Sequence, residues 1–334
     1  MKNTLHSRAL VFSILALLVL VSVSCEDDDN GFPSGDSDSD SDSDTDGDTD
    51  TDGDSDTDGD SDTDSDTDDE CIDGLDLIYV VDSGNILYSF DPENATPAAF
   101  VQIGTGNLDC VSGGQPFSMS VGRDGYAYVL FQTVLGNCVA VNKVSIQTGV
   151  CEEATPFVCG SNGDFPGTFG MGYVTDGPST IQESLYVTAS GQSIPAEAPA
   201  LGVLDVSSGQ LTSTGGTLPV AGAEFTGNQL GELWGFFPQA GTPAVAEIDK
   251  VSGAMIDSVN KYYDVSSVIT GMPNSWAFAY WGNAFYIFYK SQADPSTTVY
   301  KVDMSSGSVA PYITDTGHNI VGAGVSTCAP VVIE

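Results

Sequence analysis

The chain has 334 residues, with 47 acidic side chains against 8 basic ones and a formal net charge of −39. Such an excess of negative charge argues against nucleic-acid binding, because that affinity comes mainly from Lys and Arg on phosphates. The charge is uneven: residues 26–70 hold 23 acidic residues and no basic one, whereas residues 71–334 hold 24 acidic and 6 basic residues. We therefore expect a leader, an acidic segment and a body that can build a sizeable core.

The leader has the features of a secretory signal. Lys2 and Arg8 precede an apolar stretch at residues 9–21, which ends in small residues. A short cationic start, an apolar run of about a dozen residues and a small-residue end are typical of such signals. The run is shorter than the roughly 20 residues of a spanning helix, so an uncleaved anchor is the less favoured alternative. Residues 1–24 are thus predicted to be a signal peptide.

The residue after this run is Cys25. The arrangement resembles a bacterial lipoprotein signal, in which such a cysteine becomes the lipid-bearing first residue of the mature chain. The resemblance implies lipidation of Cys25, attachment to the membrane through that lipid, and a place in the bacterial cell envelope at the outer membrane, facing the periplasm or the exterior. Ser22 departs from the pattern, which has a large aliphatic residue three positions before the cysteine. A plain signal peptide with Cys25 as a free thiol is the alternative.

Residues 25–70 are predicted to be a disordered stalk. From Asp36 to Asp68 an Asp occupies every even position, with Ser, Thr or Gly between. Like charges on one face and the lack of an apolar face argue against a strand, and such a composition cannot drive folding. Self-repulsion extends the segment, to at most roughly 150 Å. It resembles the Ser-Asp repeats that hold adhesive domains away from bacterial cell walls.

The stalk also offers a weak calcium pattern. Asp42, Asp44 and Asp46 alternate before Gly47, like the opening of a calcium-binding loop. The twelfth position of that loop is Gly53, so the bidentate Glu is missing. We expect loose Ca²⁺ counter-ions here at most, and otherwise no cofactor.

The body, residues 71–334, shows a recurring strand-and-turn motif. Short runs rich in Val, Ile, Tyr and Phe alternate with Gly, Asp, Asn and Pro, which predicts strands and turns. Asp205, Asp249 and Asp303 each end such a run and precede a Gly, and weaker copies surround Asp91 and Ser145, at spacings of 44 to 60 residues. That period indicates a repeat architecture. Each Asp is expected to bind the backbone of a hairpin turn, with the Gly at positive φ.

Each repeat opens with a run of small residues, followed by a strand rich in aromatic and branched residues. Four strands per repeat, with a small-residue strand first, predict a propeller blade whose innermost strand lies near a crowded axis. The predicted first strands are residues 117–121, 169–174, 221–226, 275–280 and 320–326.

The two ends of the body complement each other. Residues 319–328 resemble a first strand with nothing after it, whereas 77–81, 86–90 and 98–103 resemble three strands without a first one. Together they predict one blade that closes the ring and removes both sheet edges. The fold class is therefore all-β, a β-propeller of four-stranded blades. Five blades are preferred, and six or seven stay open if residues 150–168 or 188–200 hold further strands.

The sequences at 116–129 and 87–92 resemble the broad superfamily of bacterial propellers that includes quinoprotein-like, NHL-type and lactonase-like proteins. Lactonase-like members carry calcium on the ring axis. By that resemblance, acids at the inner-strand starts such as Glu224 and Asp124 are candidate ligands of an axial metal.

Six cysteines follow Cys25, an even number that suits disulfides in an oxidising compartment. We expect Cys71 to pair with Cys328, because both flank the closing blade. Cys138 and Cys151 flank one turn and form a second candidate pair; metal binding is the less favoured use, since zinc-type spacing is missing. The six are Cys71, Cys110, Cys138, Cys151, Cys159 and Cys328.

The candidate ligand contacts are aromatic. Trp276, Tyr280 and Trp281 belong to an aromatic cluster at residues 276–289 and could stack on a sugar or anchor a peptide. The alternative, which we favour, is packing between blades, with Trp281 as the least core-like member. His318, the one histidine after the leader, reads as a turn residue, and no residue is assigned a catalytic role.

These observations predict an exported, lipid-anchored binding or adhesion module for a surface protein or glycan, more readily than an enzyme. One alternative is a metal-dependent propeller hydrolase or lyase of the lactonase-like kind. Another is an envelope assembly lipoprotein.

Overall fold

A computed structural model describes residues 71–334, apart from 73, 179, 191–198, 239–241 and 333–334. The chain divides into two units, Met1–Thr63 and Asp64–Glu334, and every described residue belongs to the second. The predicted signal peptide at 1–24, Cys25 and the stalk at 25–70 with its calcium pattern lie outside the described residues. None of the helices in the described part is long and apolar enough to cross a bilayer.

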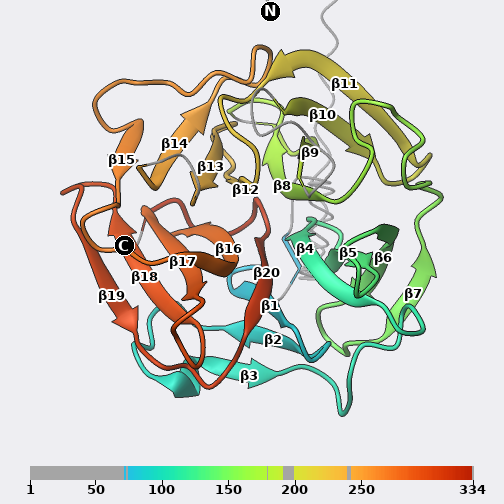
Figure 1. The fold of residues 1–334 in the computed structure, drawn as a ribbon, viewed down its shortest axis with the longest axis horizontal. Coiled ribbons are helices and arrows are strands. Elements are labelled where there is room, and N and C mark those ends of the chain that lie inside the picture. The colour runs from blue at the N-terminus through green and yellow to red at the C-terminus, as the bar shows by residue number, and fades with distance from the viewer. Residues whose placement is uncertain (1–70, 73, 179, 191–198, 239–241, 333–334) are drawn as a thin grey trace, which may run out of the picture. The chain divides into compact units, whose positions relative to one another are not determined.

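The described chain folds into five four-stranded antiparallel sheets around a common axis, an all-β propeller (Figure 1). The closing blade joins the two ends of the body, and the other four are continuous in sequence. The closing blade contains β20 (Ile320–Val325), β1 (Ile78–Asp82), β2 (Leu87–Phe90) and β3 (Phe100–Gln102). Blade 2 contains β4 (Gln115–Val121), β5 (Tyr126–Gln132), β6 (Cys138–Ser145) and β7 (Cys151–Ala154).

Blades 3 to 5 repeat this plan. Blade 3 contains β8 (Phe169–Thr175), β9 (Glu183–Ala189), β10 (Ala200–Asp205) and β11 (Gln210–Thr217). Blade 4 contains β12 (Glu224–Gly227), β13 (Leu233–Phe237), β14 (Ala244–Ile248) and β15 (Tyr262–Asp264). Blade 5 contains β16 (Pro273–Trp281), β17 (Ala284–Ser291), β18 (Thr298–Asp303) and β19 (Val309–Ile313). A short 3-10 turn, η1 (Pro97–Ala99), precedes β3.

Five blades are therefore confirmed over six or seven. Residues 150–168 contribute only β7, the outer strand of blade 2, followed by a loop. In the segment 188–200, β9 ends at Ala189 and β10 begins at Ala200.

The inner strands β20, β4, β8, β12 and β16 lie side by side in that order around the axis. Their backbones approach too closely for larger side chains. A Cβ added at Gly170 on β8 would lie 2.1 Å from the carbonyl oxygen of Ala223, just before β12. One added at Gly324 on β20 would lie 2.8 Å from Cα of Ser120 on β4. This close approach is the physical reason for the small-residue runs that open each repeat.

The closing blade forms as the two ends of the body predict. β20 pairs antiparallel with β1, with Ile78 opposite Val325. A disulfide between Cys71 and Cys328, with the Cα atoms 5.8 Å apart, lies beside this pair, as expected. The edge that β1 would otherwise expose is thereby covered.

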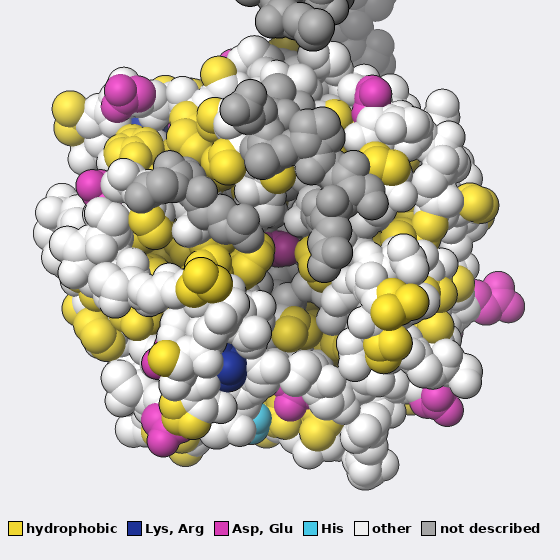
Figure 2. All heavy atoms as spheres, in the orientation of Figure 1, with side chains coloured by type: hydrophobic (Ala, Val, Ile, Leu, Met, Phe, Trp, Pro, Cys, Tyr) yellow, Lys and Arg dark blue, Asp and Glu magenta, His cyan; other side chains and the backbone are white. Residues whose placement is uncertain are grey.

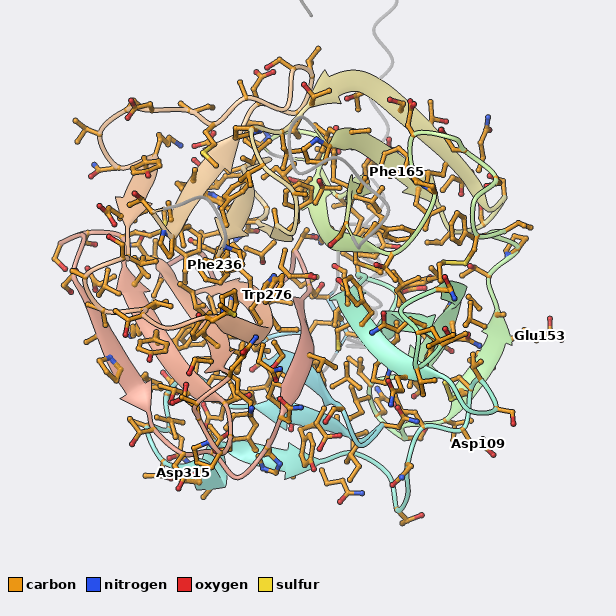
Figure 3. The ribbon with its side chains drawn as sticks, viewed as in Figure 1. Asp109, Glu153, Phe165, Phe236, Trp276 and Asp315 are labelled. Atoms are coloured by element: carbon orange, nitrogen blue, oxygen red, sulfur yellow. A yellow bond between two sulfur atoms is a disulfide. The ribbon has the colours of Figure 1, made fainter. Side chains whose placement is uncertain are left out.

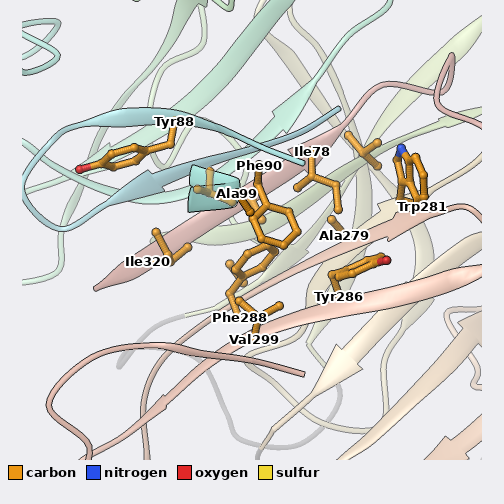
Figure 4. Close-up of a cluster of buried hydrophobic side chains, with 14 of the residues drawn as sticks. Ile78, Tyr88, Phe90, Ala99, Ala279, Trp281, Tyr286, Phe288, Val299 and Ile320 are labelled. Atoms are coloured by element: carbon orange, nitrogen blue, oxygen red, sulfur yellow. The ribbon is translucent and has the colours of Figure 1, made fainter. Parts of the chain in front are cut away.

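The core consists of five hydrophobic clusters, each between two neighbouring blades. Figure 4 shows the cluster between the closing blade and blade 5, where Phe90 and Phe288 are both fully buried with ring centroids 5.3 Å apart. Burial of one such side chain contributes roughly 1.5–3 kcal/mol. Because every cluster draws side chains from two blades, each blade is stabilised by its neighbours.

The predicted hairpin turns are confirmed. Asp205 Oδ1 accepts hydrogen bonds from the backbone amides of Ser207 (2.9 Å) and Ser208 (3.3 Å). Gly209 follows with a φ of +72°. The Ser207 and Ser208 hydroxyls also donate to this carboxylate, and these bonds lower the pKa of Asp205 to about 2. Asp249 and Asp303 accept bonds from their own turns in the same way.

The expected pairing of Cys138 with Cys151 is wrong. Cys151 lies opposite Val144 in the β6–β7 ladder, whereas Cys138 is at the far end of β6, beyond the short β7 strand. After β7 the chain continues to Cys159, which lies beside Cys138 and forms a disulfide with it. Cys151 instead pairs with Cys110, in the loop between the closing blade and blade 2.

Candidate binding site on the ring axis

A pocket of about 130 Å³ lies where the inner strands begin. Figure 3 places Trp276 near the centre of the ring, and Figure 2, in the same orientation, shows a hollow there with an acidic side chain inside. Strands β4 and β5 of blade 2, β12 of blade 4, β16 of blade 5 and β20 of the closing blade contribute to the walls. Four of the five blades therefore meet at this pocket. The lining residues are Pro116, Phe117, Gln132, Glu224, Asn274, Ser275, Trp276 and Val321.

Glu224, the first residue of β12, lines the pocket and is only 4% exposed. Its Oε2 accepts a 2.6 Å hydrogen bond from the hydroxyl of Ser118, on β4 two blades away. Ser118 Oγ in turn accepts the backbone N–H of Met171 on β8 (3.2 Å). Burial raises the pKa of Glu224 well above its usual range, although the Ser118 hydroxyl and the Met171 amide act in the opposite direction. The carboxyl therefore favours its neutral form more than an exposed Glu does.

Trp276, on β16, forms an aromatic wall. Its side chain is half-buried, and its indole N–H donates to the carbonyl of Gly222 (2.9 Å). This bond binds the segment before β12 to the neighbouring blade. The predicted first strand at residues 221–226 accordingly begins three residues later, at Glu224. The indole nitrogen is thus engaged, while the ring lines the pocket.

Phe117 supplies a second aromatic side chain, and amides complete the pocket. Phe117 and Gln132 are half-buried, whereas Asn274 is exposed and marks the rim. Lys290 Nζ lies 3.4 Å from Asn274 Oδ1, so one basic group approaches this rim. Aromatic walls with a few polar groups suit a small ligand that has both apolar and polar parts.

The other two aromatic candidates do not reach the pocket. Trp281 is 6% exposed, and its indole N–H donates to the carbonyl of Asp76. Tyr280 is 3% exposed, and its hydroxyl donates to the carbonyl of Val331 (2.8 Å). Both are packing residues, so the expectation that Trp281 is the least core-like member is wrong. Trp276 is instead the least buried of the three aromatic candidates.

The two acids proposed for an axial metal are not brought together. Asp124 is in the turn after β4, at the opposite end of the inner strands from Glu224. There it accepts the hydroxyl of Tyr128 (2.8 Å) and forms an ion pair with Lys143 (2.8 Å). Within the described ranges, no three His, Cys, Asp or Glu side chains gather to hold a metal ion.

His318 lies away from the axial pocket. Its ring packs against Tyr88 (centroids 4.5 Å apart) and Phe100 (5.1 Å). Burial lowers the pKa of its imidazole, so the neutral form is favoured.

A second hollow of about 400 Å³ lies between blades 2 and 3, near the ends of the inner strands. Its half-buried acid, Glu183, accepts the backbone N–H of Arg123 and the hydroxyl of Thr327, both at 2.8 Å. These bonds connect blade 3 to blade 2 and to the closing blade. Glu183 is already engaged in holding three blades together, so we assign the hollow a structural role.

No protein-family model matches the chain, and no curated protein matches it either. Among solved structures, it is similar to a chain of the nidogen/laminin complex, with 9% identity and a TM-score of 0.45 over 77% of this chain and 99% of that one. It is similar to TolB from Acinetobacter baumannii, with 13% identity and a TM-score of 0.39 over 70% of this chain and 51% of that one. It is also similar to the PQQ-bound aldose sugar dehydrogenase from Streptomyces coelicolor, with 9% identity and a TM-score of 0.41 over 74% of this chain and 81% of that one. These likenesses concern the propeller fold alone.

Proposed function

We propose that this chain is an exported, lipid-anchored protein of the bacterial cell envelope whose propeller is a binding or adhesion module. The observation that carries the proposal is the axial pocket, where Trp276 and Phe117 stand beside the buried carboxyl of Glu224. Aromatic faces combined with a few polar groups are the usual composition of a ligand site. The ligand is a group presented by a surface protein or a glycan.

Two further features support export of the protein and a spacer that extends the propeller away from the membrane. All six cysteines of the body are in disulfides, which form and persist in oxidising compartments. The leader at 1–24 and Cys25 have the pattern of a lipoprotein signal, and the acidic segment at 25–70 has the composition of an extended spacer. An anchored chain with such a spacer holds its binding domain away from the outer membrane.

Binding is favoured over catalysis by the make-up of the pocket. Glu224 is the one titratable side chain among the eight lining residues. General acid–base and nucleophilic mechanisms use a second group within hydrogen-bond reach, and the partners of Glu224 here are a serine hydroxyl and a backbone amide. That serine is fully buried and is not among the lining residues, so its hydroxyl is not presented to a ligand as a nucleophile.

Cell binding tests the proposal. Fluorescently labelled mature protein is added to intact bacterial and animal cells, and bound label is measured by flow cytometry. Trp276→Leu should reduce binding about fivefold or more, because loss of an anchoring aromatic at a binding site commonly exceeds 1 kcal/mol. Val251→Ser is the matched control, since Val251 is 75% exposed in the β14–β15 turn, away from the pocket. Equal binding by Trp276→Leu and the wild type would show that the axial pocket is not the binding site. A wild type that binds no cell would contradict the adhesion role.

The anchor is tested on the natively expressed chain. Intact mass spectrometry should show a diacyl or triacyl group on Cys25, and Cys25→Ser should move the protein from the membrane fraction to the soluble fraction. A mature chain without lipid in the wild type would contradict the anchoring.

The two alternatives have their own measurements. A tightly bound metal in the purified protein would favour a metal-dependent hydrolase or lyase. Protection from external protease in intact cells would place the domain in the periplasm and favour an envelope assembly role.

A further inference from the structure

The Glu224 carboxyl in the axial pocket lacks a counter-charge among the described residues. Glu224 is 4% exposed, and no ion pair among the described residues involves it. Its hydrogen-bond partners, the Ser118 hydroxyl and the Met171 amide, are neutral. A buried ionised carboxylate without a cationic partner is costly by several kcal/mol, and this cost raises the pKa of Glu224. A ligand cation would supply the missing charge.

The walls of the same pocket suit an organic cation. The rings of Trp276 and Phe117 line it, and aromatic faces attract ammonium groups through the ring quadrupole. None of the eight lining residues is basic; Lys290 approaches the rim only through Asn274. The body carries 24 acidic against 6 basic residues, so its field concentrates cations and disfavours anions.

The size and the donor set narrow the class of cation. A volume of about 130 Å³ accepts a group of a few carbon atoms and is below the roughly 300–1,000 Å³ of drug-sized sites. Hard metal ions such as Ca²⁺ take about six to eight oxygen ligands, whereas this pocket offers one carboxylate and the side-chain oxygens of Gln132, Asn274 and Ser275 beside two aromatic rings. An alkylammonium group satisfies both the carboxylate and the rings.

We propose that the axial pocket binds an alkylammonium group, with Glu224 as the counter-charge and with Trp276 and Phe117 as the aromatic walls. The inference rests on the proposed binding role and names the chemistry that the pocket recognises. Two sources offer this chemistry, a free small amine and a lysine side chain presented by a partner protein.

Binding of such a cation is coupled to proton release. Burial raises the pKa of Glu224, and an ammonium group beside the carboxyl lowers that pKa, so protons leave Glu224 on binding. The proton goes to solvent buffer, and no covalent bond to carbon or nitrogen forms or breaks. The lining residues hold no other titratable group, so the released proton comes from Glu224.

Isothermal titration calorimetry on the mature full chain tests this inference. The probes are n-butylammonium, its neutral isostere 1-butanol, and an acetylated, amidated lysine peptide. n-Butylammonium should bind about tenfold or more tightly than 1-butanol, because only the cation gains the carboxylate and ring attractions. Its binding heat should change between phosphate and HEPES buffers, which differ in ionisation enthalpy and contain no primary ammonium group that would compete for the site. A peptide that binds more tightly than the free amine points to a protein partner, and the reverse ranking points to a free amine; both support the site.

Two variants with the same charge change provide the control. Glu224→Gln keeps the shape and an oxygen that accepts the Ser118 hydrogen bond, and should lose about tenfold in affinity together with the buffer dependence. Glu153→Gln, on the exposed outer strand β7 at the periphery of the ring, should behave as the wild type (Figure 3). Thermal unfolding of both variants checks that they are folded.

Equal affinities for n-butylammonium and 1-butanol, or unchanged binding in folded Glu224→Gln, would overturn the inference. Binding of a neutral monosaccharide in place of the amine would also overturn it. Each of these results leaves the binding role intact if Trp276→Leu still reduces cell binding, so the two proposals fail separately.

Discussion

Removal of the Cys71–Cys328 disulfide should destabilise the propeller more than removal of either other disulfide. The three bonds close sequence separations of 257, 41 and 21 residues. The loop-entropy relation, which grows with the logarithm of loop length, gives about 5.6, 3.9 and 3.3 kcal/mol for them at 25 °C. All six cysteines are half-buried or exposed, so replacement by Ala changes burial similarly in each pair.

The assay is urea unfolding of the mature protein and of three double Cys→Ala variants, followed by tryptophan fluorescence. The wild type should be the most stable, and the variant without the closing-blade disulfide should have the lowest midpoint. In excess reductant the wild type and the variants should unfold at nearly the same urea concentration, which controls for effects of the Ala side chains. If loss of the Cys71–Cys328 bond lowers the midpoint no more than loss of the shortest loop, the entropic reasoning is refuted.

Three other predictions concern stability. Gly170→Ala should cost about 3 kcal/mol in urea unfolding, because its Cβ would lie 2.1 Å from the Ala223 carbonyl, whereas Gly163→Ala, with open space around it, should change stability by less than about 0.5 kcal/mol. Asp205→Ala should lower the free energy of unfolding by about 1 kcal/mol at pH 7. The pKa of Asp205 in the folded state is lowered to about 2, so this difference in stability should persist above about pH 4 and vanish as the pH falls through 2. Thermal unfolding at a series of pH values measures it. Glu224→Gln should be more stable than the wild type at pH 8. The folded state binds the Glu224 proton more tightly than the unfolded state, so the wild type loses stability as the pH rises above about 4.3. Below that pH the melting temperatures of the two proteins should converge. A Glu224→Gln melting temperature below that of the wild type at pH 8 would contradict the assigned burial cost.

Much of the fold could be predicted because its signals are local. The Asp and Gly of each hairpin turn are adjacent in sequence, and Asp205 and Gly209 adopt the expected geometry. Strand closure could be predicted because a lone strand at 319–328 complements three strands near the start of the body. The start of β12 could not be predicted from local sequence, since it depends on the hydrogen bond from the Trp276 indole to the Gly222 carbonyl, which is a contact between blades.

The site was predictable only in part. Glu224 could be named as an axial acid from its place at the start of an inner strand, but its partner Ser118 lies 106 residues earlier, and only ring closure brings the two together. Contacts between blades also explain why Trp276, and not Trp281, lines the pocket. Both are on β16, and which one is covered depends on how the neighbouring blades and the segment at Asp76 pack against that strand.

The blade that joins both ends of the body makes folding depend on completed synthesis. Ile78 pairs with Phe90 on β2, but the other edge of β1 has no partner until Val325 has been made, about 10 to 50 s later at common rates of synthesis. During that interval β1 presents an unpaired edge, which favours aggregation unless the nascent chain is shielded. A chain that stops before β20 never acquires that partner and stays open to proteases. The architecture thus gives the cell a way to distinguish finished copies from truncated ones.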